Sequence, residues 1–260
     1  MRGGAVGDRE GPRGTDKGII PGRAFSGAPG GPMGKTTITV IIPTLNEAES
    51  IGPTIDAIPR APHINVMIVD GASKDGTQDI ARERGAEVVV EPRKGYGRAY
   101  KTGFEVATGE IVVTMDGDLT YPAERVQELA DELVSKDLDF ITCDRLTQMR
   151  PGAMSRKHRF GNWVLAKATN VLFGLHIKDS QSGMWVFRRS IWPSLTVVSD
   201  GMPFSEELKI EAWRKGLRCA EVPIDYRPRV GEVKLNTWRD GWRNIKFLFK
   251  KRFGHPKETD

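Results

Sequence analysis

Short apolar runs alternate with stretches of helical periodicity from residue 36 to about residue 142. The apolar runs predict β-strands at residues 37–42, 65–70, 87–91, 110–115 and 139–142. Between them, apolar positions spaced three and four residues apart predict helices at residues 48–58, 77–84, 98–107 and 123–135. Strands and helices that alternate in this way are typical of βαβ units around a mainly parallel sheet, so the sequence predicts a single α/β domain.

The alternation becomes irregular beyond Asp144. There the pattern predicts a basic loop at residues 150–159, helices near residues 162–173 and 205–215, and strands near residues 184–188 and 218–224. We interpret this half of the chain as an elaboration of the domain that completes a functional site.

Residues 1–34 contain eleven Gly and four Pro and almost no large apolar side chain. Such a segment cannot bury enough apolar surface to offset its ordering entropy, so it is predicted to be a disordered tail. It lacks the apolar stretch and the cleavage site of a signal peptide, and Met33 is an alternative to Met1 as the start of translation.

Charge and cysteine content limit the partners and the compartment. The chain carries 39 Lys and Arg against 34 Asp and Glu, and this net charge of +5 favours anionic partners such as nucleotides, phospholipid head groups or nucleic acid. Two cysteines, Cys143 and Cys219, exclude a disulfide framework and are typical of a reducing compartment, so we expect a cytoplasmic protein. No apolar run approaches the roughly 18 to 20 residues that a membrane-spanning helix needs.

Polar residues directly follow four of the predicted strands, at residues 43–47, 70–77, 116–118 and 144–145. Ligands bind at the carboxyl ends of the strands in an open parallel sheet, so we expect these four segments to meet at one edge. The most specific of them is Asp116-Gly117-Asp118, in which two carboxylates leave a buried strand on the same side. Two such oxygen ligands suit Mg²⁺ or Mn²⁺ bound together with a substrate diphosphate. The alternative is a capping turn formed by Asp118 and Thr120.

Two other segments resemble phosphate-binding loops only in part. Residues 34–36 read Gly-Lys-Thr but lack the earlier glycine of a P-loop, and residues 95–100 lack the third glycine of a dinucleotide fingerprint. Lys94 and the amides that open the helix after it are nevertheless candidates to face an anionic nucleotide.

Taken together, the motifs resemble those of family 2 glycosyltransferases of the Rossmann-like GT-A fold, and within them the polyprenyl-phosphate (dolichyl-phosphate) mannose and glucose synthases. The similarity runs from about Thr37 to about Asn236, with several motifs in the expected order. The resemblance implies a glycosyltransferase domain at residues 35–236, followed by a basic amphipathic helix and tail at residues 237–260.

The resemblance also implies a donor site. Leu45 stands where the family often has Tyr, and Gly71 replaces the second acid of the common Asp-Asp-Gly-Ser motif. The side chains implied to bind the nucleotide-sugar are Pro43, Leu45, Glu47, Asp70, Lys94 and Asp116, and those implied to bind the metal are Asp116 and Asp118.

The acceptor side is implied by residues 179–189, which resemble the Asp-x-x-Ser-Gly-(Phe)-Arg signature with Trp185 in place of an Arg, and by an arginine that follows Val222-Pro223. The register favours Arg229 for this position, with Arg227 as the nearby alternative. The candidate acceptor residues are Arg145, Arg156, Arg159, Asp179, Ser182, Arg229 and Lys234, of which Arg156 and Arg159 are candidates for their positive charge and not from the resemblance. The candidate catalytic residues are Asp118, Arg145 and Arg229.

The chemistry of the acceptor decides which groups the site needs. A lipid monophosphate is already anionic and needs arginines to bring it beside a diphosphate, whereas a neutral hydroxyl needs a carboxylate base, for which Asp179 and Glu206 are the candidates. Several of these residues also have ordinary structural interpretations. Arg145 could pair with a neighbouring Asp, residues 156–159 could form a solvated face, and Asp179 and Glu206 could cap a turn and a helix.

The C-terminal stretch carries apolar side chains three and four residues apart, with basic residues alongside. This pattern is typical of a helix that lies in a membrane interface, and packing against the domain is the ordinary alternative. The apolar positions are Trp238, Trp242, Ile245, Phe249 and Phe253.

We therefore expect a metal-dependent, inverting glycosyltransferase that moves a hexose from a GDP- or UDP-linked sugar to a polyprenyl phosphate, in the cytoplasm and peripheral to the membrane. The alternative is transfer to a soluble small molecule or a glycan. A nucleotidyltransferase is disfavoured because no glycine-rich triphosphate loop follows the first strand. A nucleic-acid-binding role is last, because the carboxylates would repel a phosphate backbone.

Overall fold

The computed structural model of the chain describes residues 35–230 and 237–254, with the side chains of residues 237–240 left out. The predicted tail at residues 1–34 and the acceptor candidate Lys234 lie outside the described residues.

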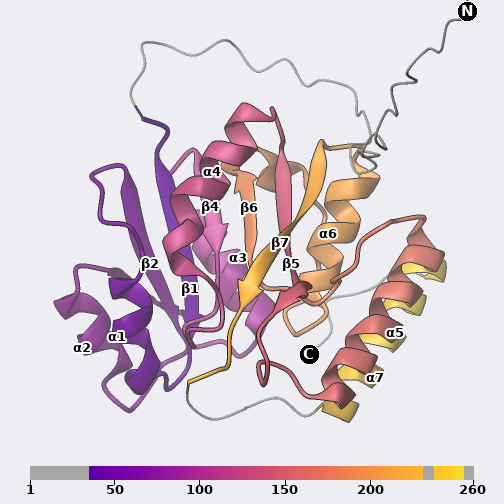
Figure 1. Cartoon of the computed structure of the whole chain (residues 1–260), viewed down its shortest axis with the longest axis horizontal. Coiled ribbons are helices and arrows are strands. Elements are labelled where there is room, and N and C mark those ends of the chain that lie inside the picture. Colours follow the sequence, from indigo (N-terminus) through magenta and orange to yellow (C-terminus); the bar gives the residue numbers. More distant parts are fainter. Residues whose placement is uncertain (1–34, 231–236, 255–260) are drawn as a thin grey trace, which may run out of the picture.

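Within the described residues, seven strands form one sheet in the order β3-β2-β1-β4-β6-β5-β7 (Figure 1). β6 is antiparallel to its neighbours β4 and β5, and the other pairs are parallel. The mainly parallel α/β sheet predicted from the sequence is therefore confirmed. The strands are β1 (Ile38–Thr44), β2 (Ile64–Asp70), β3 (Glu87–Val90), β4 (Ile111–Thr114), β5 (Phe140–Met149), β6 (Trp185–Arg188) and β7 (Cys219–Tyr226).

Helices cover both faces of the sheet (Figure 1). The core on one face draws side chains from α1, α2 and α4, and the core on the other face draws them from α3 and α6. The helices are α1 (Ala48–Asp56), α2 (Thr77–Glu83), α3 (Tyr96–Val106), α4 (Val126–Ser135), α5 (Arg156–Phe173), α6 (Phe204–Arg214) and α7 (Thr237–Phe253), with short 3-10 turns η1 (Ala123–Arg125) and η2 (Arg189–Ser194).

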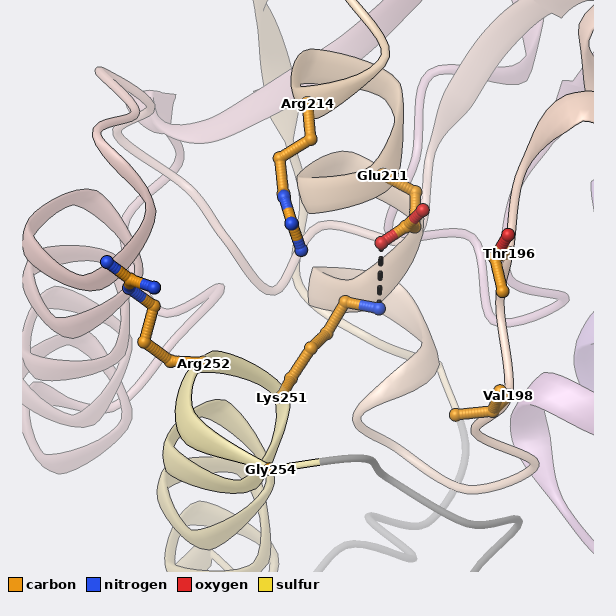
Figure 2. Close-up of a pocket in the computed structure, with 7 residues that line it drawn as sticks. All are labelled: Thr196, Val198, Glu211, Arg214, Lys251, Arg252 and Gly254. Carbon is orange, nitrogen blue, oxygen red and sulfur yellow. Dashed lines mark ion pairs between the residues drawn. The ribbon is translucent and has the colours of Figure 1, made fainter.

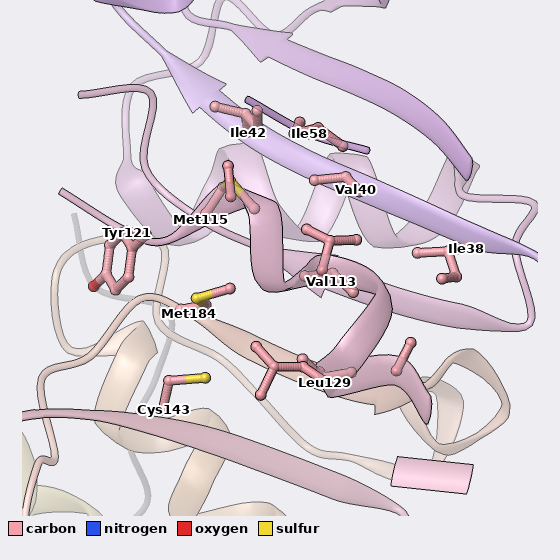
Figure 3. Close-up of a cluster of buried hydrophobic side chains, with 14 of the residues drawn as sticks. Ile38, Val40, Ile42, Ile58, Val113, Met115, Tyr121, Leu129, Cys143 and Met184 are labelled. Atoms are coloured by element: carbon pink, nitrogen blue, oxygen red, sulfur yellow. The ribbon is translucent and has the colours of Figure 1, made fainter. Parts of the chain in front are cut away.

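The alternation of side chains along β1 explains this layering. Ile38, Val40 and Ile42 point to the first core, shown in Figure 3, while Ile41 points to the second. Successive residues of a strand face opposite sides of the sheet, and a strand that is apolar on both sides must be buried between two layers. β1 is such a strand, so it lies in the interior of the sheet.

Two predicted boundaries are wrong. β5 continues to Met149 instead of ending at residue 142, because Gln148 and Met149 resume pairing with β7 after an irregularity. The predicted basic loop also ends early, since α5 begins at Arg156. The Ser155 side chain accepts a hydrogen bond from the His158 N–H and caps the first turn.

The C-terminal helix α7 packs against α5, and a small apolar cluster joins α5, α6 and α7. The face of α7 that is buried differs from the predicted apolar row. Phe247 and Leu248 are buried and Ile245 is partly buried, whereas Trp242, Phe249 and Phe253 are exposed. Packing therefore accounts for only part of the apolar pattern of this helix. No helix of the described chain is both long enough and apolar enough to cross a membrane.

A buried charge cluster fastens α7 to α6. The Lys251 ammonium lies 2.9 Å from a carboxylate oxygen of Glu207 and 2.8 Å from one of Glu211. Glu207 is fully buried and uses its second oxygen to accept the backbone N–H groups of Val198 and Ser199. The cluster is satisfied only while Lys251 is present.

Replacing Lys251 with Met is expected to lower the free energy of unfolding by about 3–5 kcal/mol, because it leaves two glutamates buried without their cation. Urea denaturation measures this change. The matched control is Lys250→Met, an exposed neighbour on the same helix, which is expected to change stability by about 0.5 kcal/mol or less. Equal effects of the two substitutions would show that the cluster does not hold α7.

Candidate functional site

The ends of β1 and β2 are joined through the carboxylate of Asp70, which is fully buried. It accepts hydrogen bonds from the Thr44 hydroxyl at 2.8 Å, from the Ser73 N–H at 2.8 Å and hydroxyl at 2.5 Å, and from the Gln78 amide at 2.7 Å. Asp70 therefore holds the turn after β2 against β1. Direct contact between Asp70 and a nucleotide stays a prediction.

The loop after β1 is fastened to the loop after β2 along its length. The Asn46 N–H donates to the Ser73 hydroxyl at 2.8 Å, and the Glu47 N–H donates to the Thr77 hydroxyl at 2.9 Å. Asn46 has a positive φ of 53°, which turns the chain away from the strand. Leu45, at the tip, is half exposed. Two of the predicted rim segments thus form one rigid corner of the site.

The Asp-Gly-Asp segment lies directly after β4, beside this corner. Asp116 accepts a hydrogen bond from the Tyr96 hydroxyl at 3.3 Å. Asp118 is nearly buried, and one of its oxygens accepts the Thr120 hydroxyl at 2.6 Å and the Thr120 N–H at 3.1 Å. The capping turn considered as the alternative is therefore present. It engages one oxygen of Asp118, and the other oxygen faces an arginine.

Arg229, which is distant in the sequence, contacts both of the segments just described. Its guanidinium lies 3.2 Å from the free carboxylate oxygen of Asp118 and 3.1 Å from a carboxylate oxygen of Glu47. Arg227, the alternative, instead pairs with Glu124 and Asp225. Of the two arginines, Arg229 is thus the one that reaches the predicted metal and nucleotide residues.

Asp116 is in an unfavourable electrostatic environment. Removal from bulk water and the nearby negative charge of Asp118 raise the pKa of Asp116 to about 7. In the described part of the chain, no third acidic, His or Cys side chain gathers with the two aspartates into a metal-binding group. The edge of the sheet therefore offers two carboxylates: Asp118 is paired with Arg229, and the pKa of Asp116 stays raised despite the nearby arginines.

Arg145, within β5 and directly after Asp144, where the pairing of β5 with β7 is interrupted, forms a buried ion pair with Asp179. The Arg145 Nε and Nη2 donate to the two oxygens of Asp179 at 2.7 and 2.9 Å, and the Arg145 backbone N–H adds a third bond at 3.1 Å. Burial alone would raise the pKa of Asp179, but the Arg145 guanidinium outweighs burial and lowers this pKa below its usual range. Pairing with a neighbouring Asp, the structural interpretation of Arg145, is what the structure shows.

Residues 179–183 are held against α6 by a buried lysine that sequence reasoning missed. The Lys209 ammonium donates to the carbonyl oxygens of Ser180 at 2.7 Å and Ser182 at 2.9 Å. Burial lowers the pKa of Lys209 to about 7. Its place between Leu208 and Ile210, two buried apolar residues of α6, was a weak signal in a helix that also carries several charged residues.

Gly183 brings this segment close to Asp116. Its carbonyl accepts the Thr114 hydroxyl at 2.8 Å, and its N–H donates to the Tyr121 hydroxyl at 2.8 Å. A Cβ at this position would lie 2.3 Å from the Tyr96 hydroxyl and 3.4 Å from an Asp116 oxygen, so only glycine permits the approach. The Ser182 side chain, predicted to bind acceptor, is buried.

Glu206, one of the candidate bases, is fully buried at the start of α6. It accepts a hydrogen bond from the Gln181 amide at 2.8 Å, and Gln181 in turn accepts one from Asn244 of α7 at 2.7 Å. Burial raises the pKa of Glu206 well above its usual range. Gln181 joins this buried carboxyl of α6 to Asn244 of α7, so the contacts of Glu206 are structural.

The remaining predicted residues lie at the surface. Arg156 and Arg159 are exposed on the first turn of α5, and Lys94 is exposed just before α3. The first turn of α3 is partly occupied, because the Asp200 carbonyl accepts the Arg98 N–H at 3.0 Å. The structure does not join Arg156, Arg159 or Lys94 to the Asp116 and Asp118 cluster by any hydrogen bond or ion pair.

A separate groove of about 410 Å³ lies near the end of α6, where Arg214, Lys251 and Arg252 line it together with Glu211 (Figure 2). Residues 204–206, which contact the 179–183 segment, are at the opposite end of the same helix. The groove is therefore not the predicted donor and acceptor site.

Residues 39–194 match the model of the family described as glycosyl transferase family 2. The chain belongs to this family. The rim residues from Pro43 to Arg145 and the segment 179–183 all lie within the matched range.

Two relatives in Haloferax volcanii are similar along most of the chain. The low-salt glycan biosynthesis hexosyltransferase Agl6 is 38% identical over 218 residues, which cover 82% of this chain and 53% of Agl6. A dolichyl-phosphate hexose transferase is 35% identical over 208 residues, which cover 78% of this chain and 89% of that protein. This family 2 chain thus spans about half the length of the first relative and most of the second.

The solved structures confirm the GT-A fold. Glucosyl-3-phosphoglycerate synthase from Mycobacterium tuberculosis, in complex with Mn²⁺, UDP and glucosyl-3-phosphoglycerate, superposes with a TM-score of 0.70 at 24% identity, covering 86% of this chain and 82% of that one. At this level of identity the likeness shows a shared fold, and this family 2 glycosyltransferase is an enzyme of that architecture.

The raised pKa of Asp116 predicts a pH-dependent stability. Asp116 keeps its proton up to about pH 7 in the folded chain, against an ordinary pKa of 3.8, so stability is lost as the pH rises through this interval. Asp116→Asn is therefore expected to stabilise the metal-free protein more at pH 8 than at pH 4, with a gain of at most about 1.4 kcal/mol per pH unit.

Urea denaturation without metal at the two pH values measures this gain. Asp131→Asn, an exposed substitution on α4, is the control and is expected to give no pH-dependent gain. A gain from Asp116→Asn that is the same at pH 4 and pH 8 would contradict the assigned environment of Asp116.

Proposed function

We propose that this chain is a metal-dependent, inverting family 2 glycosyltransferase that transfers a hexose from a GDP- or UDP-linked sugar to a polyprenyl phosphate. The acceptor phosphate oxygen attacks the anomeric carbon, the bond from that carbon to the nucleoside diphosphate breaks, and the diphosphate leaves with the bonding electron pair. A single displacement of this kind inverts the configuration at the anomeric carbon.

The observation that carries the proposal is the state of the two candidate bases. A hydroxyl acceptor needs a carboxylate that can take its proton, within hydrogen-bond reach. Asp179 is engaged on both oxygens by Arg145, and Glu206 is fully buried and accepts a hydrogen bond from the Gln181 amide. Neither carboxyl is available as a base, whereas a phosphate monoester needs none because it is anionic at neutral pH.

The acceptor phosphate needs cations, and Arg229, which bridges Glu47 and Asp118, is the arginine best placed for this role. Two guanidinium nitrogens of Arg145 are bound to Asp179, so its part in the proposal is the positive charge that it places near Asp116. Arginine presents a planar set of donors that matches phosphate oxygens, so Arg229 suits an acceptor that must approach a second polyanion.

Asp116 and Asp118 are the residues that would hold Mg²⁺ or Mn²⁺. Two neighbouring carboxylates, of which Asp116 has a raised pKa, fit a hard divalent cation whose remaining ligands come from a diphosphate. Such an ion, when bound, neutralises the charge that develops on the departing nucleoside diphosphate. The Mn²⁺ and UDP in the structure of glucosyl-3-phosphoglycerate synthase support this assignment.

The similarity to a dolichyl-phosphate hexose transferase supports the lipid-linked acceptor, and with it a peripheral position at the cytoplasmic membrane face. The second candidate is a soluble acceptor, which is favoured by the glucosyl-3-phosphoglycerate bound in the structural relative. The two candidates share the donor and the metal and differ in whether the product partitions into organic solvent.

Asp118→Asn is expected to reduce transfer from radiolabelled nucleotide-sugar to polyprenyl phosphate by roughly 100-fold or more, because charge stabilisation of the leaving group is a large catalytic term. Counting label in the organic phase, with Mn²⁺ and with EDTA, measures this. Asp131→Asn serves as the control and is expected to keep full activity. Undiminished wild-type transfer in EDTA would rule out the metal.

Arg229→Met is expected to raise the KM for the phosphorylated acceptor about 10- to 100-fold, the size of one lost charge-assisted hydrogen bond, and to leave the KM for nucleotide-sugar nearly unchanged. Steady-state kinetics with each substrate varied in turn measures both constants. Arg227→Met is the matched control, because Arg227 pairs with Glu124 and Asp225 outside the rim. Equal increases in both KM values would assign Arg229 to the donor.

A further inference from the structure

The helix pair α5 and α7, which lies at one edge of the molecule (Figure 1), leaves large apolar side chains in solvent. Most exposed large apolar residues of the described chain belong to these two helices. Their exposed fractions are 66% for Phe160, 54% for Trp163, 81% for Val171, 70% for Trp242, 51% for Phe249 and 73% for Phe253.

On each helix these side chains form one row. Phe160, Trp163 and Val171 are three and eight residues apart, and Trp242, Phe249 and Phe253 are seven and four apart, so each set shares one face of its helix. The Phe160 and Trp163 rings stack at 5.9 Å, and the Phe249 and Phe253 rings stack at 6.2 Å. Contiguous exposed apolar surface of this kind marks an interaction site.

Unpaired cations lie beside both rows. α5 contains no Asp or Glu, and the described side chains of α7 include none either. By contrast, exposed arginines elsewhere, such as Arg60 and Arg150, are paired with carboxylates. The exposed cations of the two helices, none of which forms an ion pair within the described chain, are Arg156, Lys157, Arg159, Lys167, Arg243, Lys246, Lys250 and Arg252.

We propose that the exposed face of α5 and α7 binds an anionic lipid bilayer, with the aromatic rings among the head groups and the cations on lipid phosphates. Amphipathic helices with aromatic and basic side chains lie in the interfacial layer in this way. The proposal extends the membrane contact from the C-terminal helix to α5, and it transfers Arg156 and Arg159 from the acceptor site to the membrane surface. It rests on the proposed function, which places the acceptor in a membrane.

A second copy of the chain fits this face less well. In a two-fold dimer formed through one patch, the same patch meets itself, so the eight cations of one copy would face those of the other without carboxylates to compensate them. An anionic bilayer supplies the missing negative charge over the whole face. The charge of the patch therefore favours lipid over self-association.

The exposed face of α5 and α7 is linked to the segment beside Asp116 by short connections. Asn244 of α7 donates a hydrogen bond to Gln181, which lies in the 179–183 segment beside Asp116. α5 begins eleven residues after Arg145. Docking of these helices would therefore hold the rim at a constant position relative to the lipid surface.

The experiment is co-sedimentation of the full chain with vesicles of phosphatidylcholine containing 30% phosphatidylglycerol, and with vesicles of phosphatidylcholine alone. These vesicles contain no polyprenyl phosphate, so binding is measured independently of the acceptor. We expect binding to anionic vesicles that is at least about tenfold stronger than binding to neutral ones and that weakens in 0.5 M salt.

Two double substitutions test the two helices separately. Phe160→Ser with Trp163→Ser, and Trp242→Ser with Phe249→Ser, are each expected to weaken binding to anionic vesicles at least about tenfold. Val106→Ser with Val134→Ser removes two exposed valines away from this face and is the matched control, expected to bind as the wild type does. Far-ultraviolet circular dichroism melting verifies that all variants fold.

Unchanged binding of the α5 variant would overturn the proposal, and so would equal binding to neutral and anionic vesicles. A dimer in size-exclusion chromatography that these substitutions dissociate would assign the face to self-association instead. Transfer to a short, water-soluble polyprenyl phosphate is expected to be retained by both face variants. If the wild-type protein does not transfer a hexose to this soluble polyprenyl phosphate, the result counts against the proposed function and not against lipid binding.

Discussion

The buried ion pair between Arg145 and Asp179 is the interaction on which the proposed acceptor side of the site depends. It joins β5 to the segment that precedes β6 through three hydrogen bonds. Removing one partner of such a pair leaves a buried charge without compensation, so the two residues act as a unit. The pair also supports the phosphate acceptor that we propose, because it occupies a carboxylate that a hydroxyl acceptor could otherwise use as its base.

On the proposed donor side, by contrast, the negative charge of the carboxylates is only partly compensated. Asp116 and Asp118 leave the centre of the sheet, and the protein supplies them with a tyrosine, a threonine and Arg229. This partial compensation leaves the pKa of Asp116 raised. A site that destabilises the empty protein in this way is suited to a cation and a polyanion that arrive together, which connects the geometry at the end of β4 with nucleotide-sugar chemistry.

Local patterns were sufficient to predict the sheet, its helices and the Asp116-Gly117-Asp118 motif, because each can be recognised within a short continuous segment. Contacts between distant segments were not predictable in the same way. Arg145 with Asp179 and Glu47 with Arg229 are separated by 34 and 182 positions, so their pairing depends on strand order. Lys209 was missed for a related reason: a lysine in a helix that carries several other charged residues is not conspicuous, and its role appears only when the 179–183 carbonyls lie against it.

In the C-terminal helix α7, tertiary packing buries some of the apolar residues and leaves others exposed. Its apolar row was expected to lie wholly at a membrane or wholly against the domain. Instead, Lys251 and Leu248 fasten one face to α6, while Trp242, Phe249 and Phe253 stay in solvent, as does the apolar row of the neighbouring helix α5. The same helix therefore serves packing and presents a surface, and an exposed partner row on α5 could not be assigned before the two helices were seen to be neighbours.

The central claim is that the acceptor is a lipid phosphate that needs no base. The most direct measurement is a competition in one mixture, containing Mn²⁺, GDP- and UDP-hexoses, a polyprenyl phosphate, the corresponding polyprenyl alcohol and 3-phosphoglycerate, with products identified by mass spectrometry. The account predicts a hexosyl phosphate lipid and neither of the other products. Hexosylation of the alcohol or of 3-phosphoglycerate, with the polyprenyl phosphate unchanged, would contradict it.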